Sequence, residues 1–363
     1  MRGRFVFAMF ERLKKKFQKW LSRDIGIDLG TANTLVYVPG KGVIINEPTV
    51  VAINQKTGQV VAVGKEAKRM LGRTPNHIIA VRPLVDGVIS DFEVTEEMLA
   101  YFIGKALEGN RTLLGPRVVI GVPSGTTNVE RRAVRDAAKS AGAREVHVIE
   151  EPMAAALGIR LPVDEPVGSM VVDIGGGTTD IAIISLGGIV HSKNVKIAGD
   201  KFNTDIISYI RDEFKILIGE RTAEHIKITA GAILPGKEAI ELSVRGRDLV
   251  TGLPREVVVT DSDVRQAIGI SMDNLIETIR EVLEMAPPEV VADVMHRGIY
   301  LVGGGALIRG LDVFLTEWLK VPVGIAPEPL TAVARGTGVV LEDVAAYRDI
   351  ILEEEYELPP TVS

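Results

Sequence analysis

Short apolar segments alternate with polar and glycine-rich ones from residue 24 onward. Apolar runs bounded by glycine predict strands, and an apolar period near 3.6 residues predicts helices. Strands are expected at residues 24–29, 34–38, 43–45, 50–53, 60–63, 170–173, 181–185 and 298–302. Helices are expected at residues 95–108, 128–141, 153–159, 203–219, 261–285, 311–319 and 331–347. Strands and helices alternate within two halves, which predicts an α/β protein with three-layered lobes.

The first 23 residues follow another pattern. On a helical wheel, seven large apolar side chains of residues 6–21 fall within an arc of about 120°. They are Val6, Met9, Phe10, Leu13, Phe17, Trp20 and Leu21. Every charged side chain of the segment lies outside that arc. A helix with aromatic residues on one face and cations on the other is typical of a lipid interface.

Charge separates this head from the rest of the chain. Of the 363 residues, the first 23 carry +7 and the remainder −13. An acidic body argues against nucleic-acid binding. Each cation near an anionic leaflet adds about 1 kcal/mol, which favours the inner membrane surface as a partner of the head. Docking of the head on its own protein or on a partner remains an alternative. A signal peptide is disfavoured because Lys14–Lys16 interrupt the apolar stretch.

Composition excludes several kinds of chemistry. The chain has no cysteine, which rules out disulfides and thiolate catalysis and fits a reducing cytoplasm. Its five histidines are scattered without metal-ligand spacing. It has no run of 18 apolar residues, so no spanning helix is expected.

The two halves begin alike. The segment from Ile25 to Thr34, IGIDLGTANT, is echoed by the segment from Val171 to Asp180, VVDIGGGTTD. Each is a strand with an aspartate near its end, a Gly/Thr turn and a second strand. Repetition at about one domain length indicates two lobes of related fold.

These turns suit a phosphate chain and a cation. Glycine lets backbone N–H groups approach phosphate oxygens closely. A strand-end aspartate can hold hydrated Mg²⁺, which prefers carboxylates, waters and phosphates. A single such turn is often only a tight hairpin, but a tandem pair with matching Asp, Gly and Thr is much more specific. No Gly-Lys is followed by Ser or Thr, so a Walker A loop is excluded.

Two further features carry weaker information. Gly303–Gly310 is a glycine-rich strand-to-helix turn and a plausible base-binding edge. Glu224 and Lys227 share a face if residues 222–228 are helical, and could then clamp a ribose and base. A surface ion pair is the alternative for that pair.

In order and spacing, the two hairpins and Gly303–Gly305 resemble the phosphate and adenosine motifs of the actin, heat-shock chaperone and sugar-kinase superfamily. Val122–Arg132 and Ile149–Ala156 resemble its first connecting region. In detail, residues 24–344 are similar to the MreB-like bacterial actins. The resemblance implies an actin-like fold of two lobes with ribonuclease-H-like mixed sheets flanked by helices, which bind ATP and Mg²⁺ in a cleft.

The resemblance also implies the domain limits. These are a membrane-binding head at 1–23, lobe I at 24–160 plus 333–347, lobe II at 161–332 and a tail at 348–363. Smaller subdomains are implied at about 52–85 and 205–270. The tail has no recognisable motif, and its acidic, proline-containing composition is typical of disorder.

Site roles are likewise carried over by the resemblance. It implies that Asp28 and Asp173 lie beside the metal, with Thr178 among the catalytic groups. The phosphates would contact Gly30, Thr31, Ala32, Asn33, Gly175, Gly176 and Gly177. The adenosine would contact Glu224, His225, Ile226, Lys227, Gly304, Gly305, Ala306 and Leu307. Glu151 would position the attacking water, with Glu150 as its rival, since transfer to water depends mainly on alignment and charge neutralisation.

The implied function is a slow ATPase that forms paired, membrane-associated protofilaments and organises cell-wall synthesis and rod shape with membrane-bound elongation proteins. Leu113 and Leu114 would dip into lipid beside the head residues Phe10, Leu13, Phe17 and Trp20, although a hydrophobic plug in a turn is the alternative. A non-polymerising sugar kinase or chaperone-like ATPase is the rival function. A kinase would need a catalytic aspartate where Glu151 stands, and a chaperone would need a further domain after about residue 344.

Overall fold

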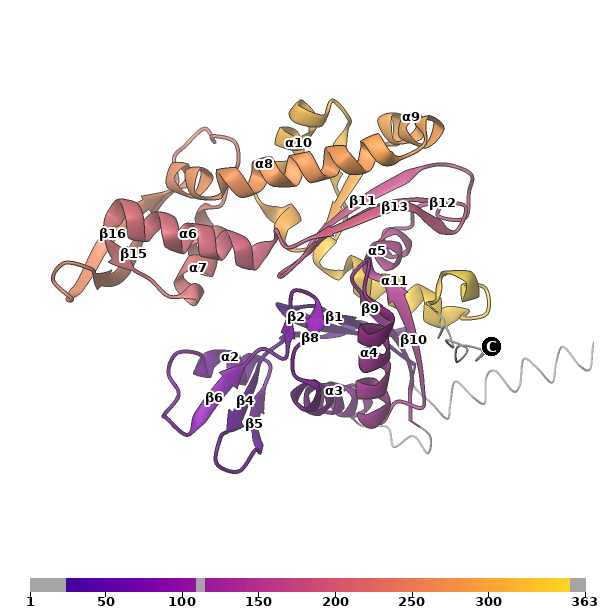
Figure 1. Cartoon of the computed structure of the whole chain (residues 1–363), viewed down its shortest axis with the longest axis horizontal. Helices are drawn as coiled ribbons and strands as arrows, with labels where there is room; N and C mark the ends of the chain where they lie inside the picture. The colour runs from indigo at the N-terminus through magenta and orange to yellow at the C-terminus, as the bar shows by residue number, and fades with distance from the viewer. Residues whose placement is uncertain (1–23, 109–114, 353–363) are drawn as a thin grey trace, which may run out of the picture. The chain divides into compact units, whose positions relative to one another are not determined.

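The structure is a computed structural model that describes residues 24–108 and 115–352. The chain forms two compact units (Figure 1). Unit 1 comprises Met1–Val122, Thr126–Ala154 and Val333–Ser363, and unit 2 comprises Pro123–Gly125 and Ala155–Ala332. Within the described ranges, no helix is long and apolar enough to cross a membrane.

The main sheet of unit 1 has five strands in the order β10-β9-β1-β2-β3. Their bounds are β1 Ile25–Leu29, β2 Asn33–Val38, β3 Gly42–Pro48, β9 Arg117–Val122 and β10 Glu145–Glu150. Strands β1, β2 and β3 pair antiparallel with one another in sequence order, whereas β9 and β10 run parallel to β1. The interior parallel strand β9 is almost entirely apolar because both of its faces are covered, whereas the outer strand β10 alternates apolar residues with Glu145, His147 and Glu150.

The remaining elements of unit 1 comprise a small sheet, a two-stranded hairpin and helices. The small sheet has the order β5-β4-β6. These elements are β4 Val51–Asn54, β5 Val60–Val63, α2 Lys65–Met70, β6 Ile78–Val81, β7 Leu84–Val85, β8 Val88–Ile89, α3 Phe92–Leu107, α4 Asn128–Ser140, α11 Ala332–Glu342 and the first half of α5 Glu151–Gly158, which continues into unit 2 from Ala155. Buried side chains of α3 and α4 pack with β1, β9 and β10 in one hydrophobic core.

Unit 2 repeats this sheet topology. Its five-stranded sheet has the order β13-β12-β11-β17-β18, again with three antiparallel strands followed by two parallel ones. The strands are β11 Ser169–Ile174, β12 Thr179–Ser185, β13 Gly188–Val195, β17 Ile299–Val302 and β18 Val323–Ile325. The internal repeat predicted from the two hairpins is therefore present in the fold of both units.

A second sheet and five helices complete unit 2. The small sheet has the order β14-β15-β16. These elements are α6 Gly199–Phe214, β14 Ile216–Leu217, α7 Glu220–Ala230, β15 Glu241–Asp248, β16 Pro254–Thr260, α8 Asp261–Met285, α9 Pro288–Arg297 and α10 Leu311–Leu319. A short 3₁₀ turn, Gly305–Leu307, follows β17.

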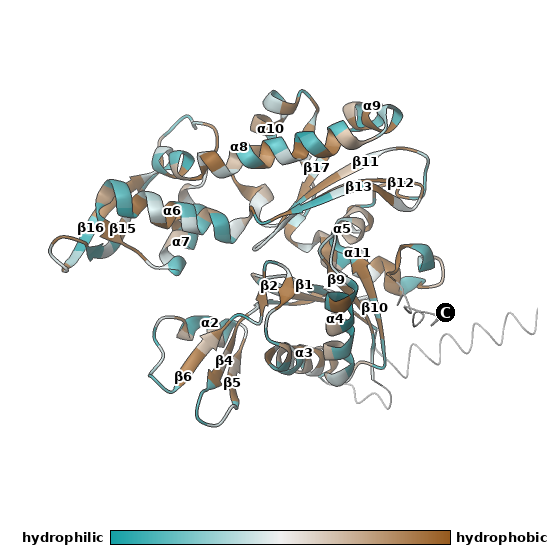
Figure 2. Cartoon of the chain, viewed as in Figure 1, coloured by the Kyte–Doolittle hydropathy of each residue, from teal (hydrophilic) through white to brown (hydrophobic). Residues whose placement is uncertain are grey.

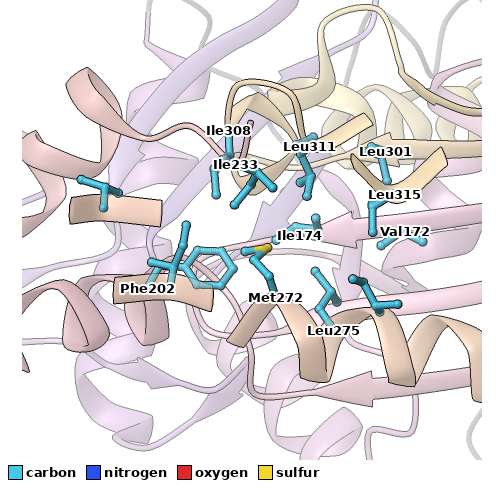
Figure 3. Packing of buried hydrophobic residues seen from close by; sticks show 14 of the residues in the cluster. Val172, Ile174, Phe202, Ile233, Met272, Leu275, Leu301, Ile308, Leu311 and Leu315 are labelled. Carbon is cyan, nitrogen blue, oxygen red and sulfur yellow. The ribbon is translucent and has the colours of Figure 1, made fainter. Parts of the chain in front are cut away.

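The core of unit 2 joins the main sheet to α6, α8 and α10. Ile174 of β11 lies beside Met272 of α8, and Val172 lies near Leu315 of α10, in one cluster that also holds Phe202 and Leu275 (Figure 3). Buried positions recur every three or four residues along α8, and hydrophobic and hydrophilic bands alternate along the same helix in Figure 2. This packing holds the end of β11 rigidly in place.

Several predicted boundaries were wrong. The helix expected at 203–219 begins at Gly199 and ends at Phe214, because Lys215 adopts a left-handed conformation and the chain enters β14. The helix expected at 331–347 ends at Glu342. The tail expected to be disordered from residue 348 is described through Leu352 and forms a 3₁₀ turn at Arg348–Ile350.

Candidate nucleotide-binding site

Asp28 is the penultimate residue of β1. It faces Leu35 of the antiparallel β2 and Gly121 of the parallel β9, so the main sheet fixes its backbone on both sides. Burial raises the pKa of Asp28 from its ordinary 3.8 to about 7. A nearby cation would stabilise the charged carboxylate and oppose this rise. The raised pKa therefore fits a carboxylate that functions beside a metal ion.

Side chains brace the turn after Asp28. Thr49 Oγ1 donates to the carbonyl oxygen of Gly30 at 2.6 Å and lies 2.9 Å from Thr34 Oγ1. Thr31 Oγ1 accepts a hydrogen bond from the backbone N–H of Gly87 at 2.9 Å. Both Thr34 and Thr49 are completely buried, so their hydroxyl groups depend on these partners. Contacts distant in sequence thus hold Gly30–Asn33 in one conformation.

The corresponding turn in unit 2 is braced by backbone groups. Gly175 N donates to Thr178 O at 3.0 Å and closes the β11–β12 hairpin. The carbonyls of Gly175 and Gly176 accept from the N–H groups of Gly199 and Asp200, at 3.1 and 2.8 Å. The glycine turn is therefore attached to the first residues of α6. Asp173, on the strand before the turn, is buried.

The third glycine motif lies against Asp173. β17 pairs in parallel with β11, with Val302 opposite Asp173. Gly303 follows with φ of +78°, and a side chain there would overlap Asp173 Oδ1 and the carbonyl oxygen of Ile174. A side chain at Gly305 would overlap Ile174. Glycine is thus required at both positions for the two motifs to meet.

The residues in and next to the 3₁₀ turn differ in solvent exposure. Gly305 and Ala306 are buried, whereas Gly304 and Leu307 are exposed. Gly304 and Leu307 are therefore the two residues of this segment with substantial surface available to a ligand.

The four residues predicted to contact adenosine between 224 and 227 lie on α7. Residues 222–228 are therefore helical, as a shared face for Glu224 and Lys227 requires. Lys227 Nζ donates to the carbonyl oxygen of Gly199 at 2.7 Å, which places this cation beside the start of α6. His225 is exposed and lies 3.5 Å from Thr229 Oγ1, and Glu224 is half-buried. Ile226 is completely buried in the core, so its side chain packs α7 against the rest of unit 2.

Glu150 and Glu151 occupy a strand-to-helix junction. β10 ends at Glu150 and α5 begins directly at Glu151, without a loop. A Cβ at Gly121 would lie 3.3 Å from Glu151 Cγ, so the glycine on β9 leaves room for this side chain. Both glutamates are half-buried. Their placement keeps both as candidates for positioning a water molecule.

Sequence reasoning missed one buried polar cluster in unit 2. Asp180 is almost completely buried, and its carboxylate accepts from Ser124 N at 2.7 Å and from Asn194 Nδ2 at 2.9 Å. It thereby anchors the Pro-Ser-Gly turn at Pro123–Gly125. The signal was present, since Asp180 ends the repeated motif and Ser124 lies in the connecting motif. Only the fold shows that the two residues meet.

The described residues contain no group of three His, Cys, Asp or Glu side chains that could hold a metal. Mg²⁺ does not require such a cage, because it is commonly held by one or two carboxylates together with waters and phosphates. Asp28 and Asp173 suit that mode. The predicted membrane residues Phe10, Leu13, Phe17, Trp20, Leu113 and Leu114 lie outside the described residues.

The paired mixed sheets and their glycine hairpins define an actin-like protein. Residues 22–349 match the family model described as MreB/Mbl protein. The cell shape-determining protein Mbl of Bacillus cereus is 52% identical over 323 residues, which cover 89% of this chain and 97% of Mbl. The chain therefore belongs to the MreB/Mbl family of cell shape-determining, actin-like proteins.

Solved structures agree with this assignment. MreB 5 of Spiroplasma citri bound to AMPPNP matches with a TM-score of 0.86 and 39% identity, over 90% of this chain and 98% of that protein. The MamK double helical filament matches with a TM-score of 0.77 and 25% identity, over 89% and 99% of the two chains.

Proposed function

We propose that this protein is a slow ATPase that assembles into membrane-associated filaments and organises cell-wall synthesis and rod shape. The observation that carries the proposal is the pair of braced glycine hairpins, each preceded by an aspartate at a strand end. The AMPPNP-bound relative and the filament-forming relative support nucleotide binding and self-association. The name of the Bacillus relative supports the role in cell shape.

In this proposal the hairpin turns bind the phosphates of ATP. Gly30–Asn33 and Gly175–Gly177 supply backbone N–H groups, which suit phosphate oxygens because small residues permit close approach. Asp28 and Asp173 hold Mg²⁺, which neutralises phosphate charge when it is bound. Glu224, His225, Lys227 and the backbone of Gly304–Leu307 bind the adenosine. Ile226 contributes through its packing.

Hydrolysis requires an aligned water molecule more than a strong base. Glu151 is the proposed positioning group, and Thr178 is proposed to assist from the glycine turn. Glu150 is the alternative because it is the adjacent residue and is also half-buried. Gln substitution separates the two glutamates. Glu151→Gln should slow turnover while leaving nucleotide affinity intact, whereas Glu150→Gln should change turnover little.

The membrane role is proposed from the sequence of the head and from the start of strands β1 and β9 in unit 1. Asp24, the first described residue, forms an ion pair with Arg117 at 2.7 Å. Residue 24 follows the head, and Arg117 lies shortly after the segment that contains Leu113 and Leu114. Because β1 and β9 are adjacent parallel strands, the strands that follow the two predicted lipid-contacting segments begin at the same end of the main sheet. The proposed location is the inner membrane surface, together with membrane-bound elongation proteins.

Electron microscopy on anionic liposomes tests the assembly. With ATP and Mg²⁺ the protein should form paired filaments on lipid, and without nucleotide it should not. Monomers that turn over ATP without assembling would favour a kinase-like or chaperone-like ATPase instead.

Deletion of residues 1–21 separates anchoring from turnover. Liposome cosedimentation should fall because the head supplies both the apolar face and the cations, while ATP turnover should remain. Undiminished lipid binding would show that the head is not the main anchor.

A further inference from the structure

We infer that a pocket in unit 1 binds the headgroup of an anionic phospholipid, with the phosphate on its basic side and the glycerol and first acyl carbons on its apolar side. Such a lipid site adds to the proposed membrane role and rests on it. Three observations on described residues carry the inference: the lining of the pocket, an unpartnered donor in its wall and its place on the main sheet.

The pocket has a volume of about 580 Å³ and is lined by ten residues. That volume is within the range of sites for small ligands. Five of the residues are basic: Arg117, Arg135, Lys139, His147 and Arg348. The other five are apolar: Val146, Val344, Ala345, Ile351 and Leu352. A lining that combines basic and apolar residues without an acidic one suits an anionic amphiphile.

The basic residues do not have equal roles. Arg135 donates to the carbonyl oxygen of Leu352, and Arg348 also has an interaction within the protein. These two arginines form part of the wall. Lys139 of α4, by contrast, is exposed and takes part in no ion pair among the residues that the structure describes. Lys139 therefore supplies the positive charge that attracts an anion.

Arg117 supplies a donor. Its Nη2 donates to Asp24 Oδ2 at 2.7 Å and to the carbonyl oxygen of Leu341 at 3.2 Å, so one end of the guanidinium is fixed and its charge is offset. The Nε of Arg117 is buried and has no hydrogen-bond partner among the described residues. An unpaired buried donor is unfavourable. A phosphate oxygen is an acceptor of the kind that a guanidinium binds well.

The pocket lies at one end of the main sheet. Strands β1, β9 and β10 are neighbours and run parallel. Arg117 is the first residue of β9 and is opposite Glu145, the first residue of β10, and the lining residues Val146 and His147 follow directly. The pocket is therefore at the end where β1 and β9 begin. The segments predicted to contact lipid precede these two strands in the sequence.

The apolar side of the pocket favours a lipid over inorganic phosphate. Ile351 forms an antiparallel bridge with Ile149 of β10, and Leu352 N donates to the carbonyl oxygen of Val148 at 2.9 Å. These contacts fix Ile351 and Leu352 in the wall before any ligand arrives. A glycerol and the start of an acyl chain can pack against such a wall, whereas free phosphate gains nothing from it.

Calorimetric titration of the full-length, nucleotide-free protein tests the site. The probe is dihexanoyl phosphatidylglycerol below its critical micelle concentration. Lys139→Glu should weaken binding at least about fivefold, because it replaces an attracting charge with a repelling one. The matched control is Lys56→Glu, the same change at an exposed lysine between β4 and β5, which should bind like the wild type. All three proteins keep the head, so their differences report on the pocket.

A second variant tests the apolar side. Ala345 is exposed, so Ala345→Asp should fold normally, and its carboxylate should also weaken binding at least about fivefold. Unchanged affinity in both Lys139→Glu and Ala345→Asp would overturn the inference. An equal loss in Lys56→Glu and Lys139→Glu would overturn it as well, because it would show a general effect of charge.

Two other probes identify the ligand. Inorganic phosphate and zwitterionic dihexanoyl phosphatidylcholine should each bind at least about tenfold more weakly than phosphatidylglycerol. Equal affinity for inorganic phosphate would assign the pocket to a free phosphate and overturn the lipid assignment. Equal affinity for phosphatidylcholine would show that the pocket does not recognise headgroup charge, and would also contradict the inference.

Failure of this inference can be distinguished from failure of the proposed membrane role. If Lys139→Glu and the wild type bind phosphatidylglycerol equally while deletion of residues 1–21 abolishes liposome binding, the pocket assignment is wrong and the role of the head stands. If the deletion leaves liposome binding intact while Lys139→Glu loses phosphatidylglycerol, the pocket stands and the head is not the main anchor.

Discussion

The two glycine hairpins have the same sequence plan but different supports. In unit 1, hydroxyl groups of Thr31, Thr34 and Thr49 hold the turn after Asp28. In unit 2, backbone N–H groups of α6 hold the turn after Asp173, and Gly303 closes against the aspartate. A repeated motif therefore preserves the geometry of a turn without preserving the residues that stabilise it. The two hairpins should consequently be sensitive to different substitutions.

The largest effect is expected at Gly303. Gly303→Ala combines a positive φ with overlap of Asp173 and Ile174, so unfolding free energy should fall by about 2–4 kcal/mol. Chemical denaturation measures the loss. The matched control is Gly252→Ala, which has a φ of +75° but nothing within 4 Å and should cost only about 1 kcal/mol. Equal losses would mean that the contact with Asp173 is unimportant.

A smaller effect is expected at Thr49 in unit 1. Thr49→Val removes the hydrogen bonds to Gly30 and Thr34 and should cost about 1–3 kcal/mol. Thr49→Ser keeps the hydroxyl and should retain most of the stability and of the nucleotide affinity. A double-mutant cycle with Thr34→Val should show coupling, since the two hydroxyls share one bond. Additive losses would contradict side-chain bracing of this turn.

The raised pKa of Asp28 gives a test of the unit 1 turn by pH. Because the pKa of Asp28 is about 7 in the metal-free fold and 3.8 ordinarily, the fold retains a proton that the unfolded chain has lost. This contribution to stability is complete below about pH 4 and disappears as the pH rises through about 7. Denaturation of metal-free protein across that range should show a decline that Asp28→Asn reduces. An identical decline in both proteins would contradict the burial of Asp28.

Local chemistry explains which parts of the fold could be predicted. The helix expected at 261–285 matches α8 at both ends, because Thr260 and Asp263 form a capping box and the apolar period is regular. The helix expected at 203–219 was predicted to end too late, because a lysine in the left-handed conformation at position 215 cannot be recognised from the sequence. β15 was not predicted because charged residues alternate along it in a small, exposed sheet.

The residues of the candidate site also fall into those that local sequence could predict and those that it could not. Asp28, Asp173 and their glycine turns could be identified because a turn is specified by residues close together in sequence. The hydrogen-bond partners of Thr49, Ser124 and Lys227 could not be predicted in this way. Their partners lie 19, 56 and 28 residues away, and only the packing of the units brings them together.

The central claim is that the aspartate-preceded glycine hairpins bind a nucleotide and Mg²⁺. Calorimetric titration of ATP and Mg²⁺ into the full-length protein and into Asp173→Ala tests it most directly, with the exposed Asp273→Ala as control. The wild type and Asp273→Ala should bind with equal affinity, and Asp173→Ala should lose measurable binding while its denaturation curve shows that it remains folded. Wild-type affinity in Asp173→Ala would contradict the assignment of the site.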